Sequence, residues 1–145
     1  MATAESCTGG WIAQTVTAIA GSSQWFDRGF VTYSNQAKIE MLGVAPTTLA
    51  QHGAVSGETA AEMVRGALAA AQVEIAVAVT GVAGPDGGTP EKPVGTVWFG
   101  WCVHDAEPVT KMICFAGDRE SIRAQTVSVA IDGLLELVTP SATPK

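Results

Sequence analysis

The chain has 145 residues and a mass of 14.9 kDa, which is the size of one ordinary domain. Hydrophobic residues make up 47% of it and charged residues only 15%, which excludes a disordered chain. The net charge of -6, with no cluster of Lys and Arg, argues against a binder of duplex nucleic acid but is compatible with a small phosphate-bearing ligand.

The first third of the sequence predicts two strands around a helix. Residues 1–5 are strand-like and lead into a turn-forming stretch. Over residues 11–19 apolar side chains recur at helical spacing until Gly21 ends the helix. Residues 28–33 carry aromatic and β-branched side chains, which favour a second strand.

Helices dominate the middle of the chain. Ser34 or Asn35 is a suitable cap for a short helix that ends at Gly43. Residues 46–51 predict another short turn or helix. A longer helix over 56–71 begins at its capping serine and has one apolar face.

The remaining elements are three strands and a final helix. Residues 73–79 form an apolar run typical of a strand that is covered on both faces. Residues 95–103 and 110–115 predict an antiparallel hairpin, and the last helix begins near Asp118.

This order, β-α-β-α-α-β-β-β-α, predicts a three-layer α/β/α sandwich with a mixed, largely parallel sheet. Residues 1–138 are expected to form a single domain. Residues 139–145, which are rich in Pro, Ser and Thr, are expected to fray.

Targeting and metal signals are weak in this sequence. No apolar run reaches the ~18 residues needed to span a bilayer, and the N-terminus lacks the pattern of a secretory signal, so no membrane association is expected. Three cysteines without C-x-x-C spacing indicate reduced thiols and a cytoplasmic location. His52 and His104 are far apart and have no companion ligands, so a His/Cys metal site is not expected.

Two Gly-rich loops follow predicted buried strands, at residues 6–10 and 80–88. Ligands of open α/β sheets gather at the carboxyl ends of the strands, so we expect both loops at one edge. The first loop runs directly into a helix, whose unpaired N–H groups can hold a phosphate or the oxyanion of an acyl intermediate. An ordinary strand-to-helix turn uses the same residue types, and neither the Walker nor the G-x-S-x-G pattern is present.

The first loop also offers a nucleophile. Ser6 and Thr8 carry hydroxyls and Cys7 carries a thiol. Lys38 lies five residues after Tyr33, the only tyrosine, and is either a solvated side chain or a base that points at Ser6. A partly desolvated lysine loses its proton more easily and can activate a serine, while Tyr33 could relay the proton or hold the leaving group.

The second loop is long enough to favour a binding role. The Thr80 hydroxyl and the neighbouring N–H groups could bind a ribose, a phosphate or a carbonyl oxygen. Arg119 and Arg123, in the first turns of the last helix, either clamp a phosphate or pair with surface acids such as Glu120.

Six spaced blocks of the sequence resemble the C-terminal domain of the competence/damage-inducible protein CinA, a domain that also occurs alone as nicotinamide-nucleotide amidase of the PncC type. The resemblance runs from Ala2 to about Leu137, and its blocks are residues 4–10, 21–23, 28–35, 52–56, 79–85 and 92–97. Family members usually carry a helix before the first strand, whereas this sequence begins almost on that strand. The larger members carry a further N-terminal domain linked to ADP-ribose pyrophosphatase activity, which 145 residues do not accommodate.

The resemblance implies deamidation of nicotinamide mononucleotide to nicotinic acid mononucleotide and ammonia, without metal or cofactor. By the family pattern Ser6 attacks the carboxamide carbon, and Lys38, assisted by Tyr33, moves the proton. The N–H groups after Ser6, together with Thr80, would stabilise the oxyanion. The residues expected to contact the pyridine nucleotide are Cys7, Thr8, Gly9, Gly10, Asn35, Thr80, Gly81, Ala83, Gly84, Arg119 and Arg123.

Two rival interpretations accompany this one. The chain could be a regulatory module that binds a nucleotide without turning it over, or an enzyme that uses Cys7 as its nucleophile. A homodimer is expected in each case, because the tryptophans and the small charged fraction allow an exposed apolar patch.

Overall fold

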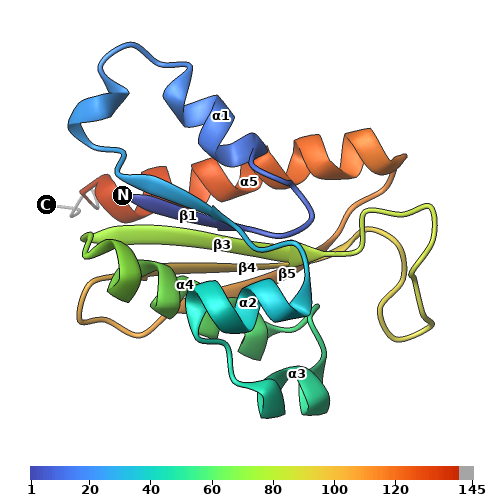
Figure 1. The fold of residues 1–145 in the computed structure, drawn as a ribbon. Helices are drawn as coiled ribbons and strands as arrows, with labels where there is room; N and C mark the ends of the chain where they lie inside the picture. The colour runs from blue at the N-terminus through green and yellow to red at the C-terminus, as the bar shows by residue number, and fades with distance from the viewer. Residues whose placement is uncertain (141–145) are drawn as a thin grey trace, which may run out of the picture.

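The computed structural model describes residues 1–140 and contains one five-stranded sheet (Figure 1). The strands lie in the order β2-β1-β3-β4-β5. Both neighbours of β1 pair with it in parallel, whereas β4 runs antiparallel to β3 and to β5, so β4 alone runs against the others. The strands are β1 (Ala2–Glu5), β2 (Arg28–Val31), β3 (Ile75–Gly81), β4 (Thr96–Val103) and β5 (Val109–Cys114).

Helices cover both faces of this sheet. The segments α1 and α5 lie on one face, and α2, α3 and α4 lie on the other (Figure 1). This arrangement confirms the predicted three-layer α/β/α sandwich with a mixed, largely parallel sheet. The helices are α1 (Trp11–Thr17), α2 (Asn35–Leu42), α3 (Pro46–His52), α4 (Gly57–Ala71) and α5 (Arg119–Val138), with a 3₁₀ turn at η1 (Ser22–Gln24).

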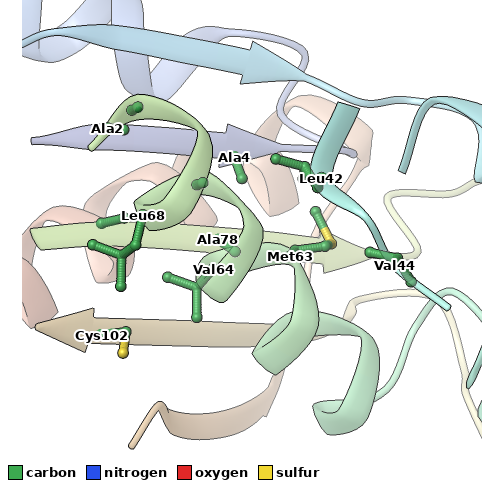
Figure 2. Packing of buried hydrophobic residues seen from close by; sticks show 12 residues of the cluster. Ala2, Ala4, Leu42, Val44, Met63, Val64, Leu68, Ala78 and Cys102 are labelled. Carbon is green, nitrogen blue, oxygen red and sulfur yellow. The ribbon is translucent and has the colours of Figure 1, made fainter. Parts of the chain in front are cut away.

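The core is divided by the sheet into two layers, because side chains alternate along each strand. Figure 2 shows Met63, Val64 and Leu68 of α4 over the small side chains of Ala4 and Ala78. The opposite layer joins bulkier residues of β3 and β4 to residues of α1 and α5. The strands supply Val77, Val79, Val97, Phe99 and Trp101, and the helices supply Ile12, Ile122, Val127, Ala130 and Leu134. Small residues on the first face let α4 approach the central strands closely.

Close helix packing sets the position of α2. A Cβ atom at Gly66 of α4 would collide with the carbonyl of Leu42, the last residue of α2. At its other end, the hydroxyl of Ser34 accepts a hydrogen bond of 3.0 Å from the N–H of Ala37 and caps the helix. The short helix is therefore held at both ends.

Several boundaries differ from those predicted. Helix α1 ends at Thr17 rather than Ile19, because the chain turns there into η1 and leaves Ile19 exposed. Strand β2 ends at Val31 rather than at Tyr33. The N–H of Thr32 still donates to the carbonyl of Glu5 at 2.8 Å, after which the chain turns into α2.

The structure also bears on the predicted end of the domain, on membrane-spanning helices and on the exposure of the tryptophans. Helix α5 ends at Val138, at the predicted end of the domain, whereas the predicted fraying over 139–145 falls largely on residues 141–145, which lie outside the described residues. Within residues 1–140, no helix combines the length and the apolarity that crossing a bilayer requires. Of the four tryptophans, all in the described part, Trp25 alone is exposed, so the apolar patch predicted for a dimer rests on fewer aromatic rings than expected.

Candidate active site

Both Gly-rich loops border one cleft at the carboxyl edge of the sheet, as predicted. Strands β1 and β3 are parallel neighbours, so the loops that leave them emerge side by side. The cleft has a volume of about 290 Å³, close to the lower end of the usual range for ligand pockets. It is lined by Ser6, Cys7, Tyr33, Asn35, Lys38, Ala54, Val55, Thr80, Gly81, Val82, Ala83, Gly84, Asp86, Gly87 and Arg119.

A buried lysine meets a serine at the floor of this cleft. Ser6 directly follows β1, and Lys38 lies one turn into α2. The Lys38 Nζ atom is 3.0 Å from the Ser6 Oγ atom, and only 1% of the lysine is exposed. Of the two interpretations of Lys38, the structure therefore selects the one in which its amine points at Ser6.

Burial makes Lys38 lose its proton more easily than a lysine in water does. Its Nζ atom also donates to the carbonyl oxygens of Thr32, at 3.0 Å, and Tyr33, at 3.3 Å. Among residues 1–140 no carboxylate forms an ion pair with it. Burial is the main cause that lowers the pKa of Lys38 below its ordinary value of 10.5. Once it has lost its proton, the amine can keep its two N–H groups on these carbonyls and direct its lone pair at the Ser6 hydroxyl.

The start of α1 differs from what the sequence suggested. The buried carboxylate of Glu5 accepts hydrogen bonds from the hydroxyl of Thr8 at 2.6 Å and from the N–H groups of Ile12 at 2.7 Å and Ala13 at 3.1 Å. These N–H groups are the unpaired donors expected to hold a phosphate or an oxyanion, so that prediction is wrong for the helix itself. The protein fills the site with its own carboxylate.

The turn between β1 and α1 still offers three donors. The N–H of Ser6 donates to Val79, and that of Gly9 donates back to the carbonyl of Ser6. Among the hydrogen bonds of the described residues, none uses the N–H of Cys7, of Thr8 or of Gly10. Cys7 lines the cleft, and Thr8 follows it directly behind that lining, so the N–H groups of these two residues are the candidates for an oxyanion hole beside Ser6.

Four predicted contact residues lie outside the cleft lining: Thr8, Gly9, Gly10 and Arg123. Arg123 binds the far side of the turn, where Nε donates to the carbonyl of Cys7 at 3.0 Å and Nη2 to that of Thr8 at 3.1 Å. Its guanidinium also lies over the ring of Trp11, at 5.3 Å from the centroid. The geometry therefore supports no direct contact of Arg123 with a ligand in the cleft, because its side chain is absent from the lining and points at the backbone of the turn.

Arg119 and Tyr33 form the other polar end of the cleft. Arg119 donates through Nη1 to the carbonyl of Gly84 at 2.7 Å and through Nη2 to the hydroxyl of Tyr33 at 3.2 Å. The tyrosine is 61% exposed, and it is its carbonyl that faces Ser6 and Lys38. No hydrogen bond within residues 1–140 joins the phenol to Ser6 or Lys38, so the proton relay predicted for Tyr33 has no direct path in this geometry.

Thr80 and Cys7 line the cleft but are constrained. The Thr80 hydroxyl donates to the carbonyl of Ala54 at 2.8 Å, which ties β3 to the connection between α3 and α4 and uses its one proton. Burial raises the pKa of the Cys7 thiol to about 11, so the thiol stays protonated near neutral pH. A protonated thiol is a poor nucleophile, which favours Ser6 over Cys7.

Sequence reasoning missed part of the cleft wall and the capping role of Glu5. Ala54 and Val55 line the cleft from the α3–α4 connection, and Asp86 lines it from the turn after β3. Apolar loop residues carry no chemical signal of their own. Membership of the block 52–56, which resembles the CinA family, was the one available indication for Ala54 and Val55, and the block 4–10 was the one for Glu5.

Fold and site together define an α/β/α domain with a buried serine–lysine pair at the carboxyl edge of its sheet. The model of the CinA C-terminal domain matches residues 1–138, and the chain belongs to this family. It is 58% identical over 132 residues to "Nicotinamide-nucleotide amidohydrolase PncC" of Escherichia coli (strain K12). This match covers 91% of this chain and 80% of that protein. It is 56% identical over 138 residues to the protein of the same name from Pseudomonas putida, and this match covers 94% of this chain and 85% of that protein.

A solved structure supports the same assignment. The competence/damage inducible protein CihA from Agrobacterium tumefaciens superposes with a TM-score of 0.93 at 48% sequence identity. The match covers 95% of this chain and 84% of that chain. The three-layer fold is therefore that of the CinA superfamily.

Proposed function

We propose that this protein hydrolyses the carboxamide of nicotinamide mononucleotide to nicotinic acid mononucleotide and ammonia. The observation that carries the proposal is the 3.0 Å contact between the Lys38 amine and the Ser6 hydroxyl inside a ligand-sized cleft. The names of the relatives that are 56% and 58% identical supply the substrate. No feature of the site favours a purely regulatory module, which needs neither a buried amine nor a serine beside it.

In the acylation half, the neutral amine of Lys38 takes the proton of Ser6 as Oγ bonds to the carboxamide carbon. The carbonyl oxygen gains the negative charge, and the N–H groups of Cys7 and Thr8 stabilise it. As the carbon–nitrogen bond breaks, Lys38 returns the proton to the departing nitrogen. Ammonia leaves, and an ester of Ser6 remains.

The deacylation half repeats these steps with water. Lys38 takes a proton from the water molecule as its oxygen bonds to the ester carbon. The ester bond then breaks, Ser6 Oγ regains the proton from Lys38, and the acid is released. A single base serves both halves because its amine stays within hydrogen-bond distance of Oγ.

We place the nucleotide phosphate at the polar end of the cleft. Arg119 carries the one guanidinium among the lining residues, and Nη2 already reaches the hydroxyl of Tyr33. Guanidinium groups bind phosphates through charge-assisted hydrogen bonds. Tyr33 accordingly contributes its hydroxyl to binding and its carbonyl to holding Lys38. Asn35, Gly81 and Ala83 form the wall between these two ends.

The test is ammonia release from nicotinamide mononucleotide by the wild-type protein, Ser6→Ala and Lys38→Ala. We expect release by the wild type alone. Full activity in both variants would remove the serine–lysine mechanism. Tight binding of the nucleotide by calorimetry, with no product after long incubation of the wild type, would replace the enzyme by a binding module.

A further inference from the structure

Arg119 and Arg123 lie one turn apart on α5 but serve different places. Arg119 reaches into the cleft, whereas Arg123 reaches the turn behind Ser6 and binds two consecutive backbone carbonyls. We propose that Arg123 is a positioning residue, which acts through these carbonyls to aim the N–H of Thr8 at the oxyanion. The proposal rests on the hydrolytic function proposed above.

Peptide geometry gives the direction of that N–H. In a trans peptide the C=O and N–H bonds point to opposite sides. The carbonyl of Cys7 belongs to the same peptide as the N–H of Thr8, and it points at the Arg123 Nε atom, 3.0 Å away. The N–H of Thr8 therefore points away from α5 and from the arginine.

The neighbouring peptide shows where that direction leads. The carbonyl of Thr8 points at the Arg123 Nη2 atom, and the N–H of the same peptide, that of Gly9, donates to the carbonyl of Ser6 at 3.1 Å. Thus the N–H bonds opposite the guanidinium turn to the Ser6 side of the loop. The N–H of Gly9 is hydrogen-bonded to the backbone of Ser6, whereas the N–H of Thr8 makes no hydrogen bond among the described residues.

The guanidinium is held in place and polarises the peptide. It lies over the ring of Trp11, the first residue of α1, in a cation–π arrangement that helps to hold it beside the turn. A cation on the carbonyl oxygen makes the N–H of that peptide a stronger donor. Glu5 anchors the other side of the turn through the N–H groups of Ile12 and Ala13. The turn is thereby clamped from both sides before a substrate binds.

The first test is steady-state ammonia release by Arg123→Met and Arg123→Lys. We expect kcat of Arg123→Met to fall about 10²-fold, with KM changed by less than about threefold, because an oxyanion donor acts mainly in the transition state. Arg123→Lys should recover part of kcat, since its ammonium can hold one carbonyl but not both. The matched control is Arg65→Met, which removes a surface cation paired with Glu107 and should leave both constants unchanged. A rise in KM with unchanged kcat would overturn the proposal, because it would mean that Arg123 binds the substrate.

The second test does not depend on the substrate. A small fluorophosphonate reacts with an activated serine as Oγ bonds to phosphorus, fluoride leaves and Lys38 takes the proton. We expect intact-mass spectrometry to show labelling of Ser6 that is at least tenfold slower in Arg123→Met than in the wild type and in Arg65→Met. Equal labelling rates would overturn the positioning role. If Arg123→Met is labelled slowly and the wild type releases no ammonia from nicotinamide mononucleotide, the positioning role is supported and only the assigned substrate is rejected.

Discussion

Replacing Lys38 by methionine tests the proposed base with little change in shape. Methionine keeps an unbranched apolar side chain and lacks the amine. The Ser6 hydroxyl is then left with one acceptor, the carbonyl of Tyr33 at 3.4 Å. A carbonyl can accept a hydrogen bond but cannot take the proton, so Ser6 loses its activation.

Two magnitudes follow from the contacts of Lys38. Loss of a general base typically lowers the rate by about 10²- to 10⁴-fold, which corresponds to about 3–5 kcal/mol in the activation barrier. The carbonyls of Thr32 and Tyr33 each lose a donor, at about 1 kcal/mol each. Lys38→Met no longer buries an ionisable amine, and the removal of this burial cost offsets part of the loss of hydrogen bonds. We therefore expect the free energy of unfolding to change by less than about 2 kcal/mol.

The assay is the initial rate of ammonia release over a series of pH values. The kcat/KM of the wild type should rise with pH to a plateau as Lys38 loses its proton, with an apparent pKa below 10.5. Lys38→Met should show a uniformly low rate without this ionisation. Lys111→Met, which removes an exposed amine on β5, is the matched control and should behave as the wild type does. If folded Lys38→Met kept more than about a tenth of kcat/KM, the lysine could not be the base.

Four further predictions concern the rest of the cleft. Tyr33→Phe should raise KM several-fold with kcat nearly unchanged, because its hydroxyl contacts Arg119; a tenfold fall in kcat would instead support a proton relay. Arg119→Met should raise KM for nicotinamide mononucleotide about 10- to 100-fold and leave KM for the riboside, which lacks the phosphate, unchanged; equal effects on both would remove the phosphate contact. Cys7→Ser should keep normal kcat, and inactivity of this folded variant would restore Cys7 as the nucleophile. Because burial raises the pKa of Cys7 from 9.0 to about 11, the folded protein keeps a proton that the unfolded chain loses in this range. The free energy of unfolding should therefore fall by about 3 kcal/mol as the pH rises from 9 through 11. Urea unfolding of Cys7→Ser should show no such fall, because this variant lacks the thiol.

The layers of the fold were predictable because periodicity and caps act locally. Ser56 and Asp118 both cap the helices predicted to begin there, with hydrogen bonds of 3.1 and 2.8 Å. The apolar run before Thr80 indicated a strand covered on both faces, and β3 occupies the centre of the sheet. Boundaries such as the end of α1 were less predictable, since they depend on where the chain meets the next turn.

The partners of polar side chains could not be predicted in the same way. Whether Lys38 points at Ser6 or at solvent depends on how α2 packs against α4, and Gly66 gave no local sign of that contact. Arg119 and Arg123 have equal chemistry and neighbouring places in the sequence. Only the position of the β1–α1 turn relative to α5 shows that Arg119 reaches into the cleft and that Arg123 lies behind it.

The most direct measurement is the identity of the covalent intermediate. The reaction of the wild-type protein with nicotinamide mononucleotide would be quenched with acid during the first turnover, digested, and mapped by mass spectrometry. The serine–lysine mechanism predicts a nicotinic acid mononucleotide ester on Ser6, absent from Ser6→Ala. Ammonia release with a thioester on Cys7, or with no modified residue in the first turnover, would contradict it.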